Sequence, residues 1–310
     1  MLEIQGLVKK YGNFKALDNL NLSVERGSVF GFVGPNGAGK TTTMKIVSGL
    51  LSATEGSVIV DGKDYSRDPE KLKEKIGYMP DFFGVYDNLK VMEYMDFYCG
   101  AYYIPYKDRP KLIENLLEIV DLKEKKDFYV DSLSRGMKQR LCLARSLVHD
   151  PELLILDEPA SGLDPRARVE MKEILKDLSA MGKTIIISSH ILSELSEMCT
   201  DIGIFDKGKL LMQGTVNDIL KKVSKKKIIK LEPLELDERI VPYLEENPYI
   251  SGIIERNTNI EFYFSGDNNE LSNILTGMIK KDIKLISFTE KEGSLEEIFM
   301  QITGGAEKND

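Results

Sequence analysis

The feature that most constrains the fold is a glycine-rich loop, GPNGAGKTT, at residues 34–42. It follows an apolar run, residues 28–33, that is typical of a buried strand, and it leads into a predicted helix. Gly34, Gly37 and Gly39 allow backbone turns that a Cβ would block, so successive N–H groups can converge on phosphate oxygens. The N-terminus of the helix adds partial positive charge at the same point. This strand–loop–helix pattern predicts a phosphate-binding loop.

The side chains of the loop indicate that the phosphates belong to a nucleotide. Lys40 can reach the β- and γ-phosphates, and the hydroxyl of Thr41 can ligate Mg²⁺. The alternative is a glycine-rich turn that binds nothing, which the combination of strand, loop, lysine and hydroxyl disfavours. The predicted nucleotide-binding residues of the loop are Gly34, Pro35, Asn36, Gly37, Ala38, Gly39, Lys40, Thr41 and Thr42.

Length and charge limit the classes of protein that fit. The chain has 310 residues, enough for one large domain with a small one, or for two of ordinary size. Its net charge of −8 argues against non-specific nucleic-acid binding. No apolar run reaches the roughly 18 residues that a membrane span needs, and the N-terminus lacks the apolar core of a signal peptide. We therefore expect a cytoplasmic protein that binds no nucleic acid.

Cysteine and histidine are too few and too scattered for a zinc site. The three cysteines are Cys99, Cys142 and Cys199, and the two histidines are His149 and His190. None has metal-ligand spacing, so we expect reduced thiols packed in or near cores. We expect His149 to make a favourable contact with the dipole of a helix C-terminus.

The apolar runs predict an α/β fold with a largely parallel sheet. Residues 153–156 and 184–188 read as buried strands, and helical segments alternate with them. Ligands of such folds bind at the carboxyl ends of the strands. The phosphate loop, Asp157-Glu158 and His190 all fall there.

The rest of the chain divides into segments of different character. Residues 82–148 are helical in period and rich in aromatic residues, which either fill the core of a helical subdomain or face a partner. The composition shifts near residue 220, where a lysine-rich run reads as a solvated linker. Beyond it the order β-α-β-β-α-β predicts a ferredoxin-like unit, and residues 294–302 read as a last helix. We expect domains at 1–220 and 221–310, with one nucleotide site.

A second acidic motif follows the apolar strand of residues 153–156, giving LLILDE. Asp157 at the tip of the strand would hold Mg²⁺ through water, as the partner of Thr41. The side chain of Glu158, one residue further on, points in another direction than that of Asp157 and could orient the attacking water as general base. The alternative is an acidic pair that only forms a loop.

A third motif, LSRGMKQR at residues 133–140, precedes that strand and opens a helix. Ser134 and Gly136 present a hydroxyl and a bare backbone at the helix N-terminus, which is a second phosphate-binding surface. In this order the three motifs resemble those of the ATP-binding-cassette (ABC) ATPases. The phosphate loop is similar to the Walker A loop of that family, LLILDE to its Walker B strand, and LSRGM to its signature.

The resemblance covers residues 1 to about 220 and implies a fold and a mechanism. The fold is a P-loop NTPase, with a RecA-like core, a helical subdomain and an antiparallel β subdomain. Two subunits form a head-to-tail dimer, most simply a homodimer, with ATP between Lys40 of one and Ser134 and Gly136 of the other. Residues 161–164, SGLD, resemble the family's D-loop. The resemblance further implies that Glu158 activates water, His190 contacts the γ-phosphate, and Tyr11 stacks on adenine.

The sequence departs from the family pattern at several positions. Asp81 stands where the family has a glutamine. It can still ligate Mg²⁺, but it adds negative charge beside the phosphates and cannot donate a hydrogen bond when ionised. Arg135 and Met137 replace the commoner glycine and glutamine of the signature, and Ala160 replaces a more usual hydroxyl residue. Ser134 and Gly136 make the phosphate contact, so we expect binding to survive the changes in the signature.

The C-terminal segment GSLEEIFM, residues 293–300, resembles the end of ATPase subunits of bacterial exporters. The leading hypothesis is therefore an ATPase that energises transport through a separate membrane permease, on the cytoplasmic face of the membrane. One alternative is an ABC ATPase that acts on ribosomes or DNA. It is disfavoured because the chain has neither a second cassette nor a long coiled-coil insertion. Another is a regulatory module that binds nucleotide without turnover.

Overall fold

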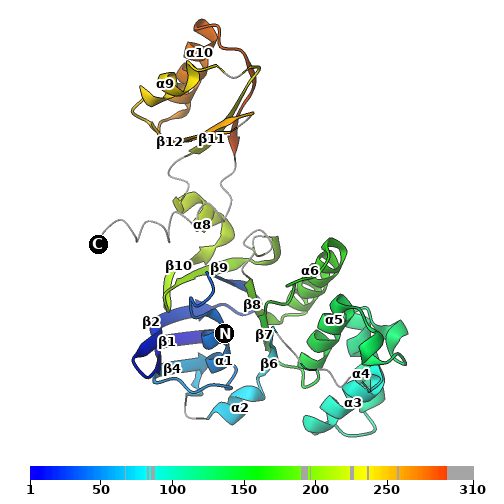
Figure 1. The fold of residues 1–310 in the computed structure, drawn as a ribbon. Coiled ribbons are helices and arrows are strands. Elements are labelled where there is room, and N and C mark those ends of the chain that lie inside the picture. Colours follow the sequence, from blue (N-terminus) through cyan, green and yellow to red (C-terminus); the bar gives the residue numbers. More distant parts are fainter. Residues whose placement is uncertain are drawn as a thin grey trace. The chain divides into compact units, whose positions relative to one another are not determined.

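The structure is a computed structural model, and it describes residues 1–66, 68–81, 84, 88–189, 195, 197–223, 227–235, 237–256 and 258–291. The chain separates into two compact units, Met1–Val216 and Asn217–Asp310, which are treated one at a time below (Figure 1). The predicted boundary, between 220 and 221, differs from this division by four residues. Both positions lie within helix α8, Val216–Val223.

The centre of the first unit is a six-stranded sheet in the order β10-β9-β3-β8-β7-β6. Strands β3, β6, β7, β8 and β9 pair in parallel, and β10 adds an antiparallel edge. Their bounds are β3 Val29–Val33, β6 Ile76–Met79, β7 Leu153–Asp157, β8 Thr184–Ser189, β9 Asp201–Asp206 and β10 Lys209–Thr215. The expected largely parallel sheet is confirmed. Strands β3, β7 and β8 are buried along their full length, which explains their uninterrupted apolar sequences.

A second, antiparallel sheet has the order β2-β1-β4-β5 (Figure 1). Its strands are β1 Leu2–Tyr11, β2 Phe14–Val24, β4 Glu55–Val60 and β5 Lys63–Asp64. Helix α1, Lys40–Val47, contacts both β2 and β7, and so joins the two sheets. Residues of both sheets and of α1 share one hydrophobic core, in which Leu2, Phe32 and Met44 are at most 1% exposed. This core fixes the start of α1, and with it the glycine-rich loop.

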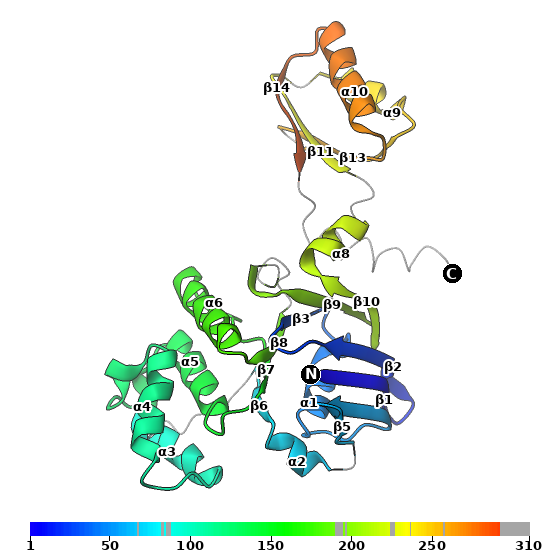
Figure 2. The same ribbon diagram turned by 180° about the vertical axis from the view of Figure 1, so that it is seen from behind.

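Helices α3, α4 and α5 form a group beside the β6 edge of the central sheet (Figures 1 and 2). The described residues before α8 form the helices α1, α2 Pro69–Lys73, α3 Val91–Ala101, α4 Arg109–Ile119, α5 Arg135–Ser146 and α6 Pro165–Ala180, with 3-10 turns Lys123–Lys125 and Val130–Ser132. Burial separates the aromatic residues of this region: Tyr94 is fully buried, whereas Tyr103 and Tyr106 are 91% and 80% exposed. The core role is therefore confirmed for Tyr94, and the partner-facing role stays a prediction. Phe82, Phe83 and Tyr86 lie outside the described residues.

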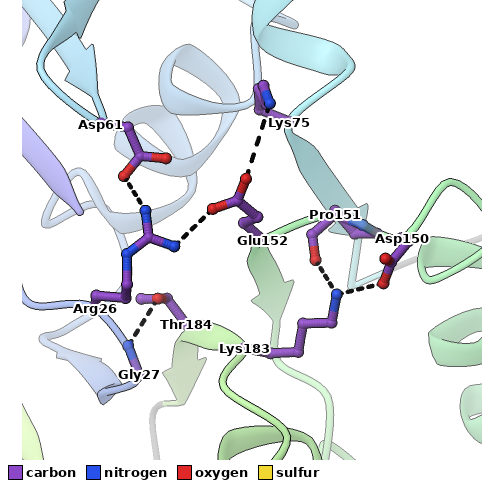
Figure 3. Close-up of polar contacts among 9 residues, drawn as sticks. All are labelled: Arg26, Gly27, Asp61, Lys75, Asp150, Pro151, Glu152, Lys183 and Thr184. Atoms are coloured by element: carbon purple, nitrogen blue, oxygen red, sulfur yellow. Dashed lines mark hydrogen bonds and ion pairs between the residues drawn. The ribbon is translucent and has the colours of Figure 1, made fainter.

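A charged cluster joins the two sheets at the amino ends of the central strands, opposite the edge that carries the glycine-rich loop (Figure 3). Arg26, before β3, donates to Asp61 after β4 and to Glu152 before β7, each at 2.6 Å. Lys75, before β6, lies 3.8 Å from the same Glu152. These side chains are largely exposed, so each pair alone stabilises the fold little. The cluster marks where four chain segments meet.

The described part of the second unit has the predicted ferredoxin-like topology. Its sheet has the order β12-β13-β11-β14, and all of its pairs are antiparallel. The elements are β11 Lys227–Pro233, α9 Ile240–Glu245, β12 Ile250–Glu255, β13 Ile260–Phe264, α10 Asn268–Lys280 and β14 Leu285–Lys291. Helix α10 begins with a capping box in which Asp267 and Glu270 satisfy each other's backbone N–H groups. The helix predicted for residues 294–302 lies outside the described residues.

Smaller expectations had mixed outcomes. All three cysteines are free thiols, and Cys99 and Cys142 are buried, as predicted. The expectation for His149 was wrong. Its Nε2 lies 3.1 Å from the carbonyl oxygen of Ile76 and its ring stacks on Tyr102. Burial lowers the pKa of His149, which disfavours the charged form of the ring. Among the described residues, no helix combines the length and the apolar character needed to cross a lipid bilayer.

Candidate nucleotide-binding site

A pocket of about 440 Å³ opens where the glycine-rich loop leaves β3. Segments that follow β6 and β7 complete it, so the carboxyl ends of three parallel strands contribute, as the sequence predicted. Its lining residues are Tyr11, Phe14, Ala16, Pro35, Asn36, Gly37, Ala38, Gly39, Lys40, Thr41, Thr42, Asp81, Asp157, Glu158 and Ser161. Of the predicted site residues, this pocket gathers Tyr11, most of the loop, Asp81, Asp157 and Glu158.

The conformation of the loop depends on its glycines. Gly37 and Gly39 have φ of 84° and 104°, which side-chain-bearing residues rarely adopt. A Cβ at Gly34 would lie 2.5 Å from the carbonyl oxygen of Phe205, so close backbone packing excludes one there. Gly39 is the N-cap of α1 and makes no side-chain cap, which leaves the N-terminal N–H groups of the helix facing the pocket.

Lys40 is 7% exposed, and its ammonium group donates to two carbonyl oxygens of its own loop. The distances are 2.5 Å to Gly34 and 3.1 Å to Pro35. Burial lowers the pKa of Lys40, and the negative charges of Glu158 and Asp157 act in the opposite direction. A cation held at the pocket by neutral carbonyls, with carboxylates nearby, can transfer its hydrogen bonds to a phosphate without a change of fold.

The acidic motif lies directly across the pocket from the loop. The Thr41 hydroxyl donates to Oδ1 of Asp157 at 3.4 Å, so the two predicted metal ligands are neighbours. Ser188 of β8 donates to the same Oδ1 at 2.6 Å and accepts from the backbone N–H of Glu158 at 3.0 Å. Glu158 has φ of 53°, an uncommon conformation that turns its side chain away from the line of the strand.

Two residues of the site were missed by the sequence reasoning. Ser188 was counted only as part of a strand, although register pairs it with Asp157 on the neighbouring strand. Phe14 was not considered, although the period of two residues in β2 places Phe14 and Ala16 on one face, next to Tyr11. His190 lies outside the described residues.

Ser134 and Gly136 do not line this pocket. Ser134 is the N-cap of α5, and its hydroxyl accepts from the N–H of Met137 at 3.3 Å. Both residues line a different pocket of about 660 Å³. Gln139 lies on the same helix as Gly136, and its Nε2 donates at 3.3 Å to the carbonyl oxygen of Ser161, which lines the first pocket. One chain therefore presents two separate halves, a phosphate loop and a signature surface.

The fold and the site together define a P-loop ATPase of the cassette type. The sequence profile of the ABC transporter family matches residues 17–161, and that of the C-terminal domain of DrrA1-3-like ATP-binding proteins matches residues 214–303. The chain belongs to the ATP-binding proteins of ABC transporters, and it is an ATPase of that family.

The chain is similar to several curated ATP-binding proteins. The linearmycin resistance ATP-binding protein LnrL of Bacillus subtilis is 31% identical over 306 residues, 98% of each chain. The bacitracin transport ATP-binding protein BcrA of Bacillus licheniformis is 33% identical over 307 residues, again 98% of each chain. The Nod factor export ATP-binding protein I of Ralstonia nicotianae is 36% identical over 220 residues, 71% of this chain and 68% of the relative.

Solved structures resemble the first unit. The structure of the ATP-binding subunit of an ABC transporter has a TM-score of 0.65 and 28% identity, and covers 72% of this chain and 93% of that one. A dimeric ATP-binding cassette in a post-hydrolysis state, bound to ADP and Pi, has a TM-score of 0.63 and 25% identity over 70% of this chain and 99% of that one.

Proposed function

We propose that this ATPase is the energy-supplying subunit of an exporter, and that it works as a head-to-tail dimer beneath a separate membrane permease. The observation that carries the proposal is the pocket itself, where Lys40, Thr41 and Asp157 lie together, while Ser134 and Gly136 lie at another. A second copy would supply the missing half of each nucleotide site.

The residues of the pocket fit Mg²⁺ as well as ATP. A threonine hydroxyl and a carboxylate at 3.4 Å are the hard oxygen donors that this ion prefers, and Asp81 adds a third oxygen ligand at the rim. When bound, Mg²⁺ would neutralise phosphate charge in the transferred group. Ser188 would act as a positioning residue, because its hydrogen bond to Asp157 at 2.6 Å holds the carboxylate toward Thr41.

The division of labour in hydrolysis follows from this arrangement. Lys40 and the loop backbone would hold the phosphates, with Lys40 exchanging the carbonyl oxygens of its own loop for phosphate oxygens. Glu158 would accept a proton from the attacking water as general base. Its backbone N–H is fixed by Ser188 at 3.0 Å, so the carboxylate projects from a defined position.

Export as the direction of transport rests on the relatives. LnrL is named for linearmycin resistance, and the Ralstonia protein for Nod factor export. LnrL matches this chain along 98% of its length, including the second unit. We propose by this likeness that the chain works on the cytoplasmic face of the cell membrane, with a permease as its partner and no nucleic acid.

The catalytic assignment is tested by Glu158→Gln in the purified full chain. We expect ATP turnover to fall by about a hundredfold or more, in keeping with the loss of a general base. The variant should still bind ATP and accumulate as a dimer when Mg²⁺ and ATP are present, which light scattering after gel filtration would measure. The matched control is Glu173→Gln, because Glu173 lies on the surface of α6 and pairs only with Lys176 among the described contacts.

Two outcomes would overturn parts of the proposal. Normal turnover in Glu158→Gln would remove Glu158 as general base. Nucleotide binding without any turnover in the unmodified chain would favour the regulatory-module alternative.

The permease is tested by purification of the tagged chain from gently solubilised native membranes. A multi-span membrane protein in near-equal amount supports the transporter role, and recovery with ribosomes or DNA contradicts it.

A further inference from the structure

A small pocket of about 240 Å³ lies between the β6 edge of the central sheet and the helical group. The segment after α1, the end of α2 and strand β6 line one side, and helices α3 and α5 line the other. The lining residues are Ser48, Leu50, Lys73, Ile76, Tyr78, Tyr98, Tyr102, Arg145 and Ser146. None of them lines the pocket of the phosphate loop or that of the signature, so the nucleotide role does not account for this pocket.

The charge of the pocket is positive. Lys73 and Arg145 line it, and every other lining residue is uncharged. By contrast, several carboxylates line each of the two other pockets, and the whole chain carries a net charge of −8. The pocket therefore attracts anions although the chain as a whole repels them.

Arg145 is a half-buried cation with no carboxylate partner among the described residues. Its Nη1 donates to the hydroxyl oxygens of Tyr94 and Tyr98 at 3.4 and 3.3 Å, and its guanidinium group lies 5.0 Å from the centre of the Tyr98 ring. These contacts are with neutral groups and use fewer than the five N–H donors of an arginine. Because a buried charge is costly unless it is paired, an anion beside Arg145 would be stabilised.

A second donor faces the same problem. Tyr78 lines the pocket, and its hydroxyl is buried with no hydrogen-bond partner among the described residues. Buried polar groups are nearly always paired, so this hydroxyl and the guanidinium together suit an acceptor with several oxygens, such as a phosphate. Lys73 adds a third donor, since its 2.7 Å pair with Glu70 is exposed and contributes little.

The rim of the pocket is aromatic and continues onto an exposed loop. Tyr102 lines the pocket and is 39% exposed, and Tyr103 and Tyr106, which follow it in the chain, are 91% and 80% exposed. Tyr103 has φ of 57°, an unfavourable conformation for a residue with a Cβ, and such strain is concentrated at binding sites. Residues 102–111 also include three basic side chains and one acidic side chain. Exposed tyrosines among basic residues are typical of surfaces that meet the headgroups of a bilayer.

We infer that this pocket binds the phosphate of an anionic phospholipid headgroup, with the exposed tyrosines of the loop 102–106 at the lipid–water interface. Arg145 and Tyr78 donate to the phosphate oxygens, and Lys73 adds positive charge. Free phosphate shares this chemistry, but it makes no use of the aromatic rim. The inference goes beyond the proposed function, in which only the permease links the chain to the membrane.

The absence of tryptophan from the chain makes a direct test possible. Tyr103→Trp places the only tryptophan on the exposed loop. In the full chain its emission should shift to shorter wavelength with vesicles of equal parts phosphatidylglycerol and phosphatidylcholine. Vesicles of phosphatidylcholine alone, or inorganic phosphate, should cause no shift. The matched control is Tyr129→Trp, at a tyrosine that is 56% exposed and lies beside the start of α3, whose emission should not respond.

The pocket itself is tested by sedimentation of the full chain with the same anionic vesicles. Lys73→Gln should weaken binding about fivefold, the size typical of one basic residue at an anionic bilayer. Its matched control is Lys176→Gln, because Lys176 is also an exposed lysine paired with a glutamate three residues away, and binding should change less than about twofold. Arg145→Gln should weaken binding about tenfold. Tyr78→Phe removes only a hydroxyl, should weaken binding about threefold, and decides the matter with Lys73→Gln if Arg145→Gln does not fold.

Four results would overturn the inference. The unmodified chain does not sediment with anionic vesicles. Lys73→Gln and Tyr78→Phe bind the vesicles as well as the unmodified chain does, which places the lipid contact elsewhere. Calorimetry shows that inorganic phosphate binds the pocket and displaces no lipid. The chain binds only vesicles of phosphatidylcholine that carry the membrane protein with which it co-purifies, which assigns the pocket to a protein partner. None of these results alters the ATPase assignment, which Glu158→Gln tests separately.

Discussion

Alanine substitutions at three glycines of the phosphate loop should separate two physical costs, backbone strain and steric overlap. Gly37 has φ of 84° and open space around its Cα, so Gly37→Ala introduces strain alone. Gly34 has no positive φ, but a Cβ there would lie 2.5 Å from the backbone oxygen of Phe205. Gly39 combines both, with φ of 104° and a Cβ position 2.7 Å from Cδ2 of Leu17.

The expected magnitudes follow from these geometries. A left-handed conformation costs an alanine about 1–2 kcal/mol. The lower entropy of the unfolded chain offsets about 0.4–1 kcal/mol of this cost, so Gly37→Ala should lower the free energy of unfolding by about 1 kcal/mol. At Gly39 the Cβ would meet Cδ2 of the buried Leu17 at 2.7 Å and the backbone oxygen of Ala16 at 3.1 Å, which adds a steric cost and gives a loss of about 2–3 kcal/mol. The oxygen of Phe205 belongs to β9 and cannot move alone, so Gly34→Ala should lose about 3 kcal/mol or more.

Differential scanning calorimetry of the full chain measures this order. The transition of the first unit can be identified because ADP should raise its midpoint. For a unit of this size 1 kcal/mol corresponds to about 2–4 °C, so the predicted shifts are about 3 °C for Gly37→Ala and about 8 °C or more for Gly34→Ala. Gly12→Ala, with φ of 57° and no atom within 4 Å of its Cβ, is the control outside the loop. A loss at Gly37 equal to that at Gly34 would refute the reasoning, because overlap with the backbone oxygen of Phe205 would then cost no more than backbone strain alone.

Two further predictions concern side chains that the fold brings into place. Ser188→Ala should lower the free energy of unfolding by about 1–3 kcal/mol, because it removes the hydroxyl that accepts from the N–H of Glu158. It should also weaken the Mg²⁺ dependence of ATP turnover. An unchanged Mg²⁺ titration would contradict the positioning role. Burial lowers the pKa of His149, so the unfolded chain binds more protons in acid, and stability should be full above the unperturbed pKa of about 6.5 and fall as pH drops below it. The variant His149→Phe keeps a ring against Tyr102 but cannot titrate. Between about pH 7.5 and pH 5.5, the midpoint of its thermal unfolding should therefore fall less than that of the unmodified chain. An equal fall would show that other groups are responsible.

Much of the site could be predicted because its determinants are local in sequence. The loop, the apolar strand before it and the acidic pair after β7 are each written within a few residues. The rule that parallel strands end at one edge then places them together, and the 3.4 Å contact between Thr41 and Asp157 confirms the expected neighbourhood. The start of α6 is also encoded locally, since Asp164 caps the helix just before Pro165.

What could not be predicted depends on pairing between distant segments. The role of Ser188 follows from a register that aligns it with Asp157, and the sequence of β8 alone does not contain that register. His149 was misjudged for the same reason, because its partner is the carbonyl of Ile76, 73 residues away. Phe14 lies outside all three motifs, and only the observed β1–β2 pairing places it beside Tyr11 at the pocket.

The topology of the second unit has a consequence for its modularity. Its first strand, β11, pairs with its last, β14, and Ile228 lies opposite Lys291. The described chain thus enters and leaves this sheet at neighbouring positions, and none of the sheets is shared between the two units. Removal of residues 227–291 would take away one complete sheet with its own core, and would cut no strand pairing of the ATPase unit. Within the described residues, the second unit therefore has a sheet and a hydrophobic core of its own, and the strand pairing of the ATPase unit does not depend on it.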